Sequence, residues 1–278
     1  MPREVWIRII CSSLYHSDIT FRDIQDPLAI FPRVLGHEAT GVMESIGKDV
    51  TEVTKGDLVV PVILPECGEC INYKSTKSNR CTNFPFNVSP WMPRDGTTRF
   101  TDQNGDIIYH FLFISSFSEY TVVDIANLIK IDPEIPPNRA CLFGCGKKFG
   151  VTDFVNAGEC GNKPIIIEKT GTGADYCFEC VGMASLILEA YASCRMGWGK
   201  TIVLGVDRPG AKINLNSHDV LHDGKSLMGS LFGGLKPKSH VPILLKRYVD
   251  KLDEFVTHEV EFKDINKAFD LLSKGQCL

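Results

Sequence analysis

Two groups of side chains in the sequence could bind a metal ion. The first consists of Cys11, His37, Glu38 and Cys145, which are scattered along the chain. Two thiolates and one imidazole, with a fourth position left for water or substrate, form the ligand set of a catalytic zinc ion. Composition alone favours another interpretation, because cysteines are often buried and a histidine also fits a glycine-rich turn. The local sequence around each residue has to decide between the two.

The second group is Cys67, Cys70 and Cys81, which lie close together in the segment CGECINYKSTKSNRC. The chain has 11 cysteines, an odd number that argues against a disulfide framework and favours metal ligands. Another Cys-x-x-Cys pair, Cys177 and Cys180, lies in YCFECVG. That segment is typical of a buried strand, in which these two side chains point in opposite directions. We therefore interpret the pair as core packing.

The bulk properties exclude several classes of function. A net charge of −4 and a pI near 6.0 give no indication of nucleic acid or an anionic membrane as partner. No apolar run approaches the roughly 20 residues that span a bilayer. The opening segment MPREVWIRIIC has no apolar signal core. We expect a cytoplasmic protein.

The hydrophobic pattern changes along the chain. Residues 5–60 alternate strand-like runs with turns, and residues 65–110 are rich in Cys, Pro, Asn and Gly, as in a loop-dominated lobe. After residue 150, short strand-like runs alternate with the helical segment SLILEAYASC, which predicts a parallel sheet. The final segment predicts helix, strand and helix, with EFVTHEVEF as the strand.

Three short motifs give the chain a family resemblance. CSSLYHSD, GHEATG and FGCG together resemble the zinc-dependent alcohol dehydrogenases of the medium-chain family, and GWGKTIVLGVD with LMGSLFGGLKPKS resembles their plant members. The resemblance implies an α/β fold: a GroES-like β-rich catalytic domain plus a truncated Rossmann-type parallel sheet that lacks its first βαβ unit. It divides the chain into catalytic residues 1–146, a partial dinucleotide-binding domain at 147–231, and a catalytic return segment at 232–278.

The resemblance also assigns roles to the first group of side chains. It implies that Cys11, His37 and Cys145 hold the catalytic zinc, while Glu38 lies behind them or coordinates transiently. Zinc lowers the pKa of a bound alcohol, and the proton must then leave by a relay. Two residues match the relay positions: the hydroxyl of Ser13 and, at its solvent end, the imidazole of His16.

The second group departs from the family pattern at one position. Relatives with this lobe place four cysteines here as a structural zinc site. This chain keeps Cys67, Cys70 and Cys81 but has Tyr73 at the third ligand position, and a phenol is a poor zinc ligand beside thiolates. Two alternatives are open. Three thiolates with water or a carboxylate such as Glu66 or Glu69 could hold zinc, or the lobe could be an unmetallated loop.

The resemblance implies NAD as cofactor, yet the chain lacks the motif that grips its pyrophosphate. That motif is a GxGxxG loop at a helix N-terminus within a βαβ unit of ~30 or more residues. Only Gly146 lies between Cys145 and Lys147, where the family places this unit. The nicotinamide side is retained, and by resemblance its lining residues are Val181, Gly182, Leu204, Val206, Ser230 and Phe232.

Three hypotheses about activity follow. The chain could be a working NAD-dependent dehydrogenase of small alcohols or aldehydes, an impaired truncated isoform, or an inactive zinc protein. In the third case it acts by dimerising with full-length relatives. We expect a homodimer or such a heterodimer, and the resemblance implies pairing through the strands around Ile202 and Leu227. The missing βαβ unit also predicts a shortened sheet that either exposes the edge of YCFECV or covers it with the segment DFVN at 153–156.

Overall fold

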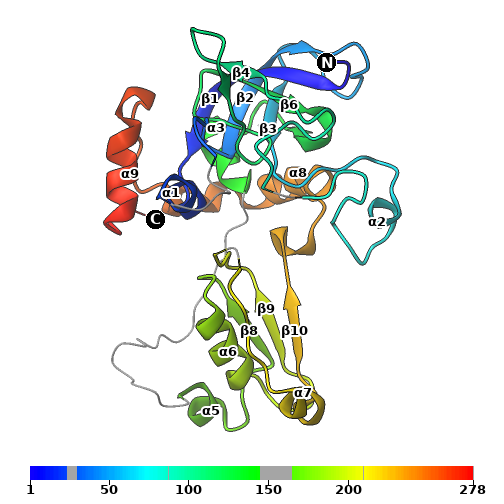
Figure 1. The fold of residues 1–278 in the computed structure, drawn as a ribbon, viewed down its shortest axis with the longest axis vertical. Coiled ribbons are helices and arrows are strands. Elements are labelled where there is room, and N and C mark those ends of the chain that lie inside the picture. Colours follow the sequence, from blue (N-terminus) through cyan, green and yellow to red (C-terminus); the bar gives the residue numbers. More distant parts are fainter. Residues whose placement is uncertain (24–29, 87, 145–164, 209, 278) are drawn as a thin grey trace. The chain divides into compact units, whose positions relative to one another are not determined.

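The computed structural model describes residues 1–23, 30–86, 88–144, 165–208 and 210–277. The chain forms two compact units (Figure 1). The first contains residues 1–147 and 235–278, and the second contains residues 148–234.

The first unit is built on a five-stranded sheet in the order β6-β1-β2-β3-β7, in which every neighbouring pair is antiparallel. The strands are β1 (Glu4–Ser13), β2 (Glu38–Ile46), β3 (Leu58–Pro61), β6 (Tyr120–Asp124) and β7 (Leu128–Lys130). Along β1, Val5 and Ile7 are buried while Trp6 between them is exposed. The period-two pattern of the sequence therefore places one face of β1 against the core.

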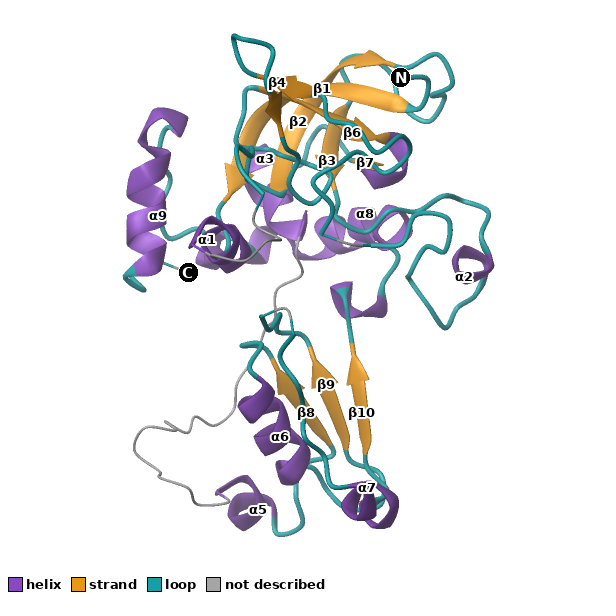
Figure 2. Cartoon of the chain, in the orientation of Figure 1, coloured by secondary structure: helices purple, strands orange, loops and turns teal. Residues whose placement is uncertain are grey.

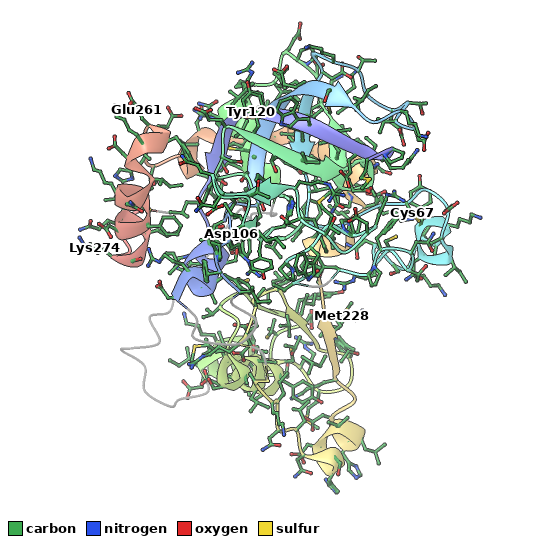
Figure 3. All side chains as sticks on the ribbon, turned by 45° about the horizontal axis from the view of Figure 1, so that its top comes forward. Cys67, Asp106, Tyr120, Met228, Glu261 and Lys274 are labelled. Carbon is green, nitrogen blue, oxygen red and sulfur yellow. The ribbon has the colours of Figure 1, made fainter. Side chains whose placement is uncertain are left out.

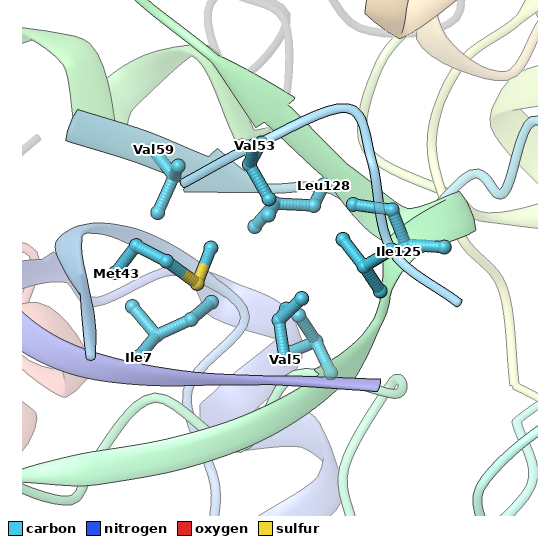
Figure 4. Packing of buried hydrophobic residues seen from close by; sticks show 9 residues of the cluster. Val5, Ile7, Met43, Val53, Val59, Ile125 and Leu128 are labelled. Carbon is cyan, nitrogen blue, oxygen red and sulfur yellow. The ribbon is translucent and has the colours of Figure 1, made fainter. Parts of the chain in front are cut away.

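The core of this sheet is a cluster of nine buried side chains (Figure 4). Its members come from β1, β2, β3, β6, β7 and the intervening turns: Val5, Ile7, Met43, Val50, Val53, Val59, Val123, Ile125 and Leu128. Burying one such aliphatic side chain contributes about 1.5–3 kcal/mol. The cluster therefore fixes the positions of β1, which carries Cys11, and of β2, which begins at Glu38 directly after His37.

Helices and a small hairpin complete the first unit (Figure 2). They are α1 (His16–Asp23), α2 (Ile71–Lys74), α3 (Pro137–Ala140), α8 (Pro237–Tyr248), α9 (Ile265–Ser273) and the hairpin β4 (Phe100–Thr101) with β5 (Ile107–Ile108). In α9, Phe269 and Leu272 are buried at the three-residue spacing of one helix face. The Phe269 ring contacts Phe117 and lies under the guanidinium of Arg22, which docks α9 beside α1.

The second unit contains a parallel sheet in the order β10-β9-β8. Its strands are β8 (Tyr176–Glu179), β9 (Lys200–Val203) and β10 (Ser226–Gly229), and its helices are α5 (Ile165–Thr170), α6 (Ala184–Ser193) and α7 (Ser217–Asp223). Helix α6 packs against β8 and β9, burying Ile187 and Tyr191 one turn apart. Among the described residues β8 pairs only with β9, so the prediction of a shortened parallel sheet is confirmed. The segment DFVN lies outside the described residues.

One predicted strand is wrong. The segment EFVTHEVEF overlaps the short 3-10 helix Asp253–Phe255 at its start and a second 3-10 helix, Phe262–Asp264, at its end, with irregular backbone between them. Residues 257–262 are exposed along this segment. Its alternating pattern therefore has no buried face to stabilise a strand. None of the described helices is both long and apolar enough to span a membrane.

Candidate metal and coenzyme sites

His37 has the surroundings of an oriented metal ligand. It directly precedes β2 and is 1% exposed. The carboxylate of Asp18, fully buried in α1, accepts hydrogen bonds from the Gly36 N–H at 2.9 Å and the Tyr15 N–H at 3.1 Å, and lies 3.3 Å from His37 Nδ1. A carboxylate behind Nδ1 fixes the ring and favours the tautomer with a lone pair on Nε2. Ser17 Oγ lies 3.2 Å from that Nε2.

The turn before His37 depends on a glycine. Gly36 has φ of 88°, in the left-handed region, and a Cβ there would lie 2.5 Å from side-chain atoms of Ser116 and Phe117. Only glycine fits this close approach. The GHE motif is therefore a tight turn that delivers His37 and Glu38 to the start of β2.

An aromatic wall closes one side of the His37 ring. Phe111, fully buried, packs edge-on against His37 at 5.7 Å and against Phe21 at 5.2 Å. The guanidinium of Arg33 lies 5.8 Å from the same Phe111 ring and has no hydrogen-bond partner among the described residues. Burial lowers the pKa of Arg33 from its ordinary value. The wall excludes water from one side of the imidazole.

Cys11 lies near the end of β1. Ile9 pairs with Gly41 and Cys11 with Thr40, so β1 contains one extra residue, Ile10, at an irregularity just before Cys11. Such an extra residue redirects the side chains that follow it. The Cys11 thiol contacts Cys141, which lowers the pKa of Cys11 against the opposing effect of burial.

The Cys11 side chain thus packs against an apolar cluster of Cys141, Leu142 and Leu252. Within the described part of the chain, Cys11, His37 and Glu38 do not form a group of ligand atoms close enough to hold one ion. Cys145 lies outside the described residues. The predicted zinc set therefore stays a prediction, supported in the structure at His37.

The predicted relay residues, Ser13 and His16, stay a prediction. Ser13 Oγ donates a hydrogen bond to Glu38 Oε2, because Ser13 pairs with Glu38 across β1 and β2. His16 is exposed at the start of α1. The hydroxyl beside the imidazole of His37 belongs to Ser17, which the sequence analysis did not select. Asp18 was also missed, although the acidic residue in the first turn of a short helix after CSSLYHS was a visible signal.

The six residues assigned to the nicotinamide side all lie at or just beyond the carboxyl ends of β8, β9 and β10. Parallel strands bring these ends to the same edge of a sheet, where open α/β sheets bind their ligands. The loops after β8 and β9 approach each other closely at Gly182 and Gly205. A Cβ on Gly205 would lie 1.9 Å from the Gly182 nitrogen, so the approach depends on glycine. The buried Glu179 carboxylate accepts hydrogen bonds from the N–H groups of Val181 and Gly182 at 2.8 and 2.7 Å. Glu179 therefore fixes this loop, a role that the sequence analysis missed.

The structure brings together all three cysteines of the second group. The sulfur atoms of Cys67, Cys70 and Cys81 lie within 4.8 Å of one another, and these residues are the one group of at least three potential Cys, His, Asp or Glu ligands in the described residues (Figure 3 labels Cys67). Each sulfur accepts a backbone N–H at 3.3 Å, from Cys70, Tyr73 and Phe84 respectively. The cluster fits a structural zinc site.

The electrostatics of these thiols differ. Burial on its own would raise the pKa of Cys70, but hydrogen bonds to its sulfur from Thr82 and the Tyr73 N–H lower that pKa to about 6. Burial raises the pKa of Cys81. A thiolate at Cys70 near neutral pH favours binding of a cation, since thiolates are the form that ligates metal.

Comparisons with known proteins cover the whole chain. Residues 1–133 match the family described as alcohol dehydrogenase GroES-like domain, and residues 144–249 match zinc-binding dehydrogenase. Alcohol dehydrogenase-like 7 of Arabidopsis thaliana is 52% identical over 341 residues, covering 100% of this chain and 87% of the relative. Alcohol dehydrogenase class-3 of Oryza sativa subsp. japonica is 36% identical over 339 residues, covering 99% of this chain and 88% of the relative.

The first of these alignments measures a shortening of the chain. It spans 341 positions, whereas this chain has 278 residues, so at least 63 positions of the alignment have no residue here. The loss is larger than a surface loop and is about the size of one or two βαβ units.

Solved structures show the same fold. An alcohol dehydrogenase zinc-binding domain protein from Burkholderia ambifaria has a TM-score of 0.84 at 23% identity. Benzyl alcohol dehydrogenase from Acinetobacter calcoaceticus has a TM-score of 0.79 at 22% identity. Each comparison covers 99% of this chain and 90% of the solved chain.

Proposed function

This chain belongs to the zinc-containing alcohol dehydrogenases of the medium-chain family, and we propose that it binds zinc but is impaired in the NAD-dependent oxidation of alcohols to aldehydes or ketones. The observation that carries the proposal is the shortened second unit. A three-stranded sheet is described there, and the sequence of 278 residues contains no GxGxxG motif. Pyrophosphate binding relies on the N–H groups of such a loop at a helix N-terminus.

The part of a coenzyme site that this chain retains supports weak binding at most. Val181 and Val206 are 65% and 74% exposed at the strand ends. These apolar groups can contact a nicotinamide ring, but they supply no donors for a diphosphate. A site that contacts only the nicotinamide ring lacks the charge-assisted hydrogen bonds to the diphosphate, which make phosphate binding strong. We therefore expect NAD to bind far more weakly than it binds to full-length relatives.

The metal half of the reaction is supported in part. Zinc in a catalytic site of this family would act as a Lewis acid that makes a bound alcohol a stronger acid. His37 is the proposed ligand with suitable surroundings, because Asp18 orients its ring and Phe111 shields it. Cys11, whose thiol packs against Cys141, and Cys145 remain proposed ligands by family. Ser17, beside Nε2, is a better placed hydroxyl for proton transfer than Ser13.

Coenzyme binding and turnover test this proposal directly. Purified, zinc-loaded protein is titrated with NAD by fluorescence, and NADH formation from ethanol and longer alkanols is followed by absorbance. A full-length relative from Arabidopsis thaliana, prepared identically, is the positive control. We expect no saturable binding up to millimolar NAD and no turnover above background. Micromolar affinity, or measurable NADH formation by this chain, would show the proposal to be wrong.

A second candidate function, as a non-catalytic isoform that dimerises with full-length relatives, is favoured by one observation. In the second unit Tyr176, Phe178 and Met228 are 57%, 45% and 49% exposed, and their register places them on one face of the sheet. Among the described residues, β8 and β10 each pair along one edge only, and an apolar face beside such an edge is typical of an interaction surface. Co-expression with a differently tagged full-length relative, followed by pull-down, tests it. Recovery of the relative supports the second candidate, and recovery of this chain alone excludes it.

A further inference from the structure

We infer that the Cys67–Cys70–Cys81 cluster is an open metal site: three thiolates hold the ion, and the fourth coordination position is available to a small exogenous ligand. This inference is independent of the proposed impairment of coenzyme binding. It concerns which ligands this chain itself offers, at a position where a closed structural site needs four.

The three sulfurs are already near the spacing that a tetrahedral ion requires. With a Zn–S bond of about 2.3 Å, two sulfurs on one tetrahedral ion lie about 3.8 Å apart. The observed sulfurs all lie within 4.8 Å of one another, so shifts of about 1 Å at most bring them onto one ion. The N–H donors from Cys70, Tyr73 and Phe84 hold each sulfur in a tight turn and stabilise negative charge on it. The cluster is therefore built for a cation.

No fourth protein ligand joins this cluster in the described part of the chain. The group contains no carboxylate or imidazole. Glu66 Oε1 instead accepts a hydrogen bond from the Lys238 N–H at 2.6 Å, and Glu69 Oε1 accepts one from Asn83 Nδ2 at 3.0 Å. Neither glutamate belongs to the group of ligand atoms as the structure describes it.

Tyr73 is held by contacts other than its hydroxyl. Its N–H donates to Cys70 Sγ, its carbonyl accepts a hydrogen bond from Lys236 Nζ, and the same ammonium lies 5.2 Å from the centre of its ring. A phenol ionises near pH 10, so at neutral pH it competes poorly with thiolates for zinc. The tyrosine therefore occupies the place of a ligand without acting as one.

Space for a small ligand exists beside the cluster. A pocket that opens to solvent beside the exposed Tyr73 has an inner space of about 10 Å³, roughly enough to admit one water molecule, and is lined by Glu66, Tyr73, Cys81 and Lys236 among others. Glu66 is 6% exposed, and its Oε2 has no hydrogen-bond partner among the described residues. A buried carboxylate oxygen without a donor is costly, and a water or other donor in the pocket would satisfy it. This acceptor and the adjoining pocket favour an exogenous fourth ligand.

Cobalt spectroscopy of the full-length chain tests the inference without any measurement of activity. Metal-free protein is loaded with Co²⁺, and the sulfur-to-cobalt charge-transfer and d–d bands are recorded while imidazole is added. A Cys70→Ser variant, measured in parallel, identifies the bands that belong to this cluster. We expect cluster bands that shift saturably with imidazole. Cluster bands that do not respond, or a wild-type spectrum identical to that of Cys70→Ser, would overturn the inference.

Two substitutions at Tyr73 sharpen the result. Tyr73→Cys should supply the missing thiolate, abolish the imidazole response and slow transfer of Zn²⁺ to a chromogenic chelator by about tenfold or more. Tyr73→Phe is the matched control, and it should keep both the wild-type spectrum and its imidazole response. Loss of the wild-type bands in Tyr73→Phe would identify the phenol as a ligand and refute the open site. If Tyr73→Cys does not fold, the imidazole titration of wild type and Tyr73→Phe still decides.

Discussion

Replacing Asp18 with asparagine should strongly destabilise the first unit. The substitution keeps the size of the side chain but removes its charge and turns one acceptor oxygen into a donor. In the structure the two carboxylate oxygens accept separate backbone N–H groups, from Gly36 at 2.9 Å and Tyr15 at 3.1 Å. Whichever way the amide is oriented, one of these N–H groups faces another donor in a fully buried position.

The size of the effect follows from these contacts. A buried donor left without its acceptor costs about 1–3 kcal/mol, and loss of charge assistance at the remaining bonds adds about 1 kcal/mol. The expected loss in the free energy of unfolding is therefore about 2–4 kcal/mol. Asp23, on the same helix, is exposed and pairs only with its neighbour Arg22 among the described contacts. Asp23→Asn is the matched control and should change stability by less than about 0.5 kcal/mol.

Urea unfolding measures both variants. Trp6 and Trp91 lie in the first unit and report its unfolding by fluorescence, while Trp198, in the second unit, is replaced by phenylalanine in every protein compared. Equal unfolding midpoints for Asp18→Asn and Asp23→Asn would refute the reasoning, because they would mean that the buried carboxylate does not anchor the turn before His37.

Three further predictions follow from single side chains. Burial lowers the pKa of His110 to about 4, so between pH 6.5 and pH 4 the unfolded chain binds a proton that the folded chain does not. The free energy of unfolding should fall by up to about 3 kcal/mol as pH is lowered through this window, and the fall should be smaller in His110→Gln. Urea unfolding at a series of pH values measures both proteins, and the same dependence on pH in both would contradict this. Burial, with the neighbouring Cys194, raises the pKa of Cys177 to about 12, whereas Cys180 is exposed. Iodoacetamide at pH 8 should therefore label Cys180 well before Cys177, which peptide mass spectrometry checks, and equal rates would argue against the described strand. A Cβ on Gly41 would lie 2.4 Å from a methyl group of Ile7 on the neighbouring strand. Gly41→Ala should therefore lower the free energy of unfolding, measured with heat or urea, by about 1–3 kcal/mol. A variant as stable as wild type would show that β1 and β2 can move apart to admit the methyl group at no cost.

Features that depend on neighbouring residues in the sequence were predictable. The alternation of Val5, Trp6 and Ile7 indicates a strand with one buried face, because side chains in a strand alternate with period two. Cys67 and Cys70 meet because three residues make one tight turn. The missing GxGxxG loop is a property of the sequence itself, and it correctly predicted a shortened parallel sheet.

Contacts between distant segments were decided only by the tertiary structure. Asp18 reaches His37 because α1 packs beside the turn that precedes β2, and no local pattern specifies that pairing. Cys11 contacts Cys141, 130 positions further along the chain, and the extra residue Ile10 shifts the register of β1 against β2 just before Cys11. Register and packing are set by the summed burial of many side chains over long stretches of chain. The sequence therefore determined which chemical groups this protein has and which motif it lacks, while the folded arrangement decided which of those groups meet.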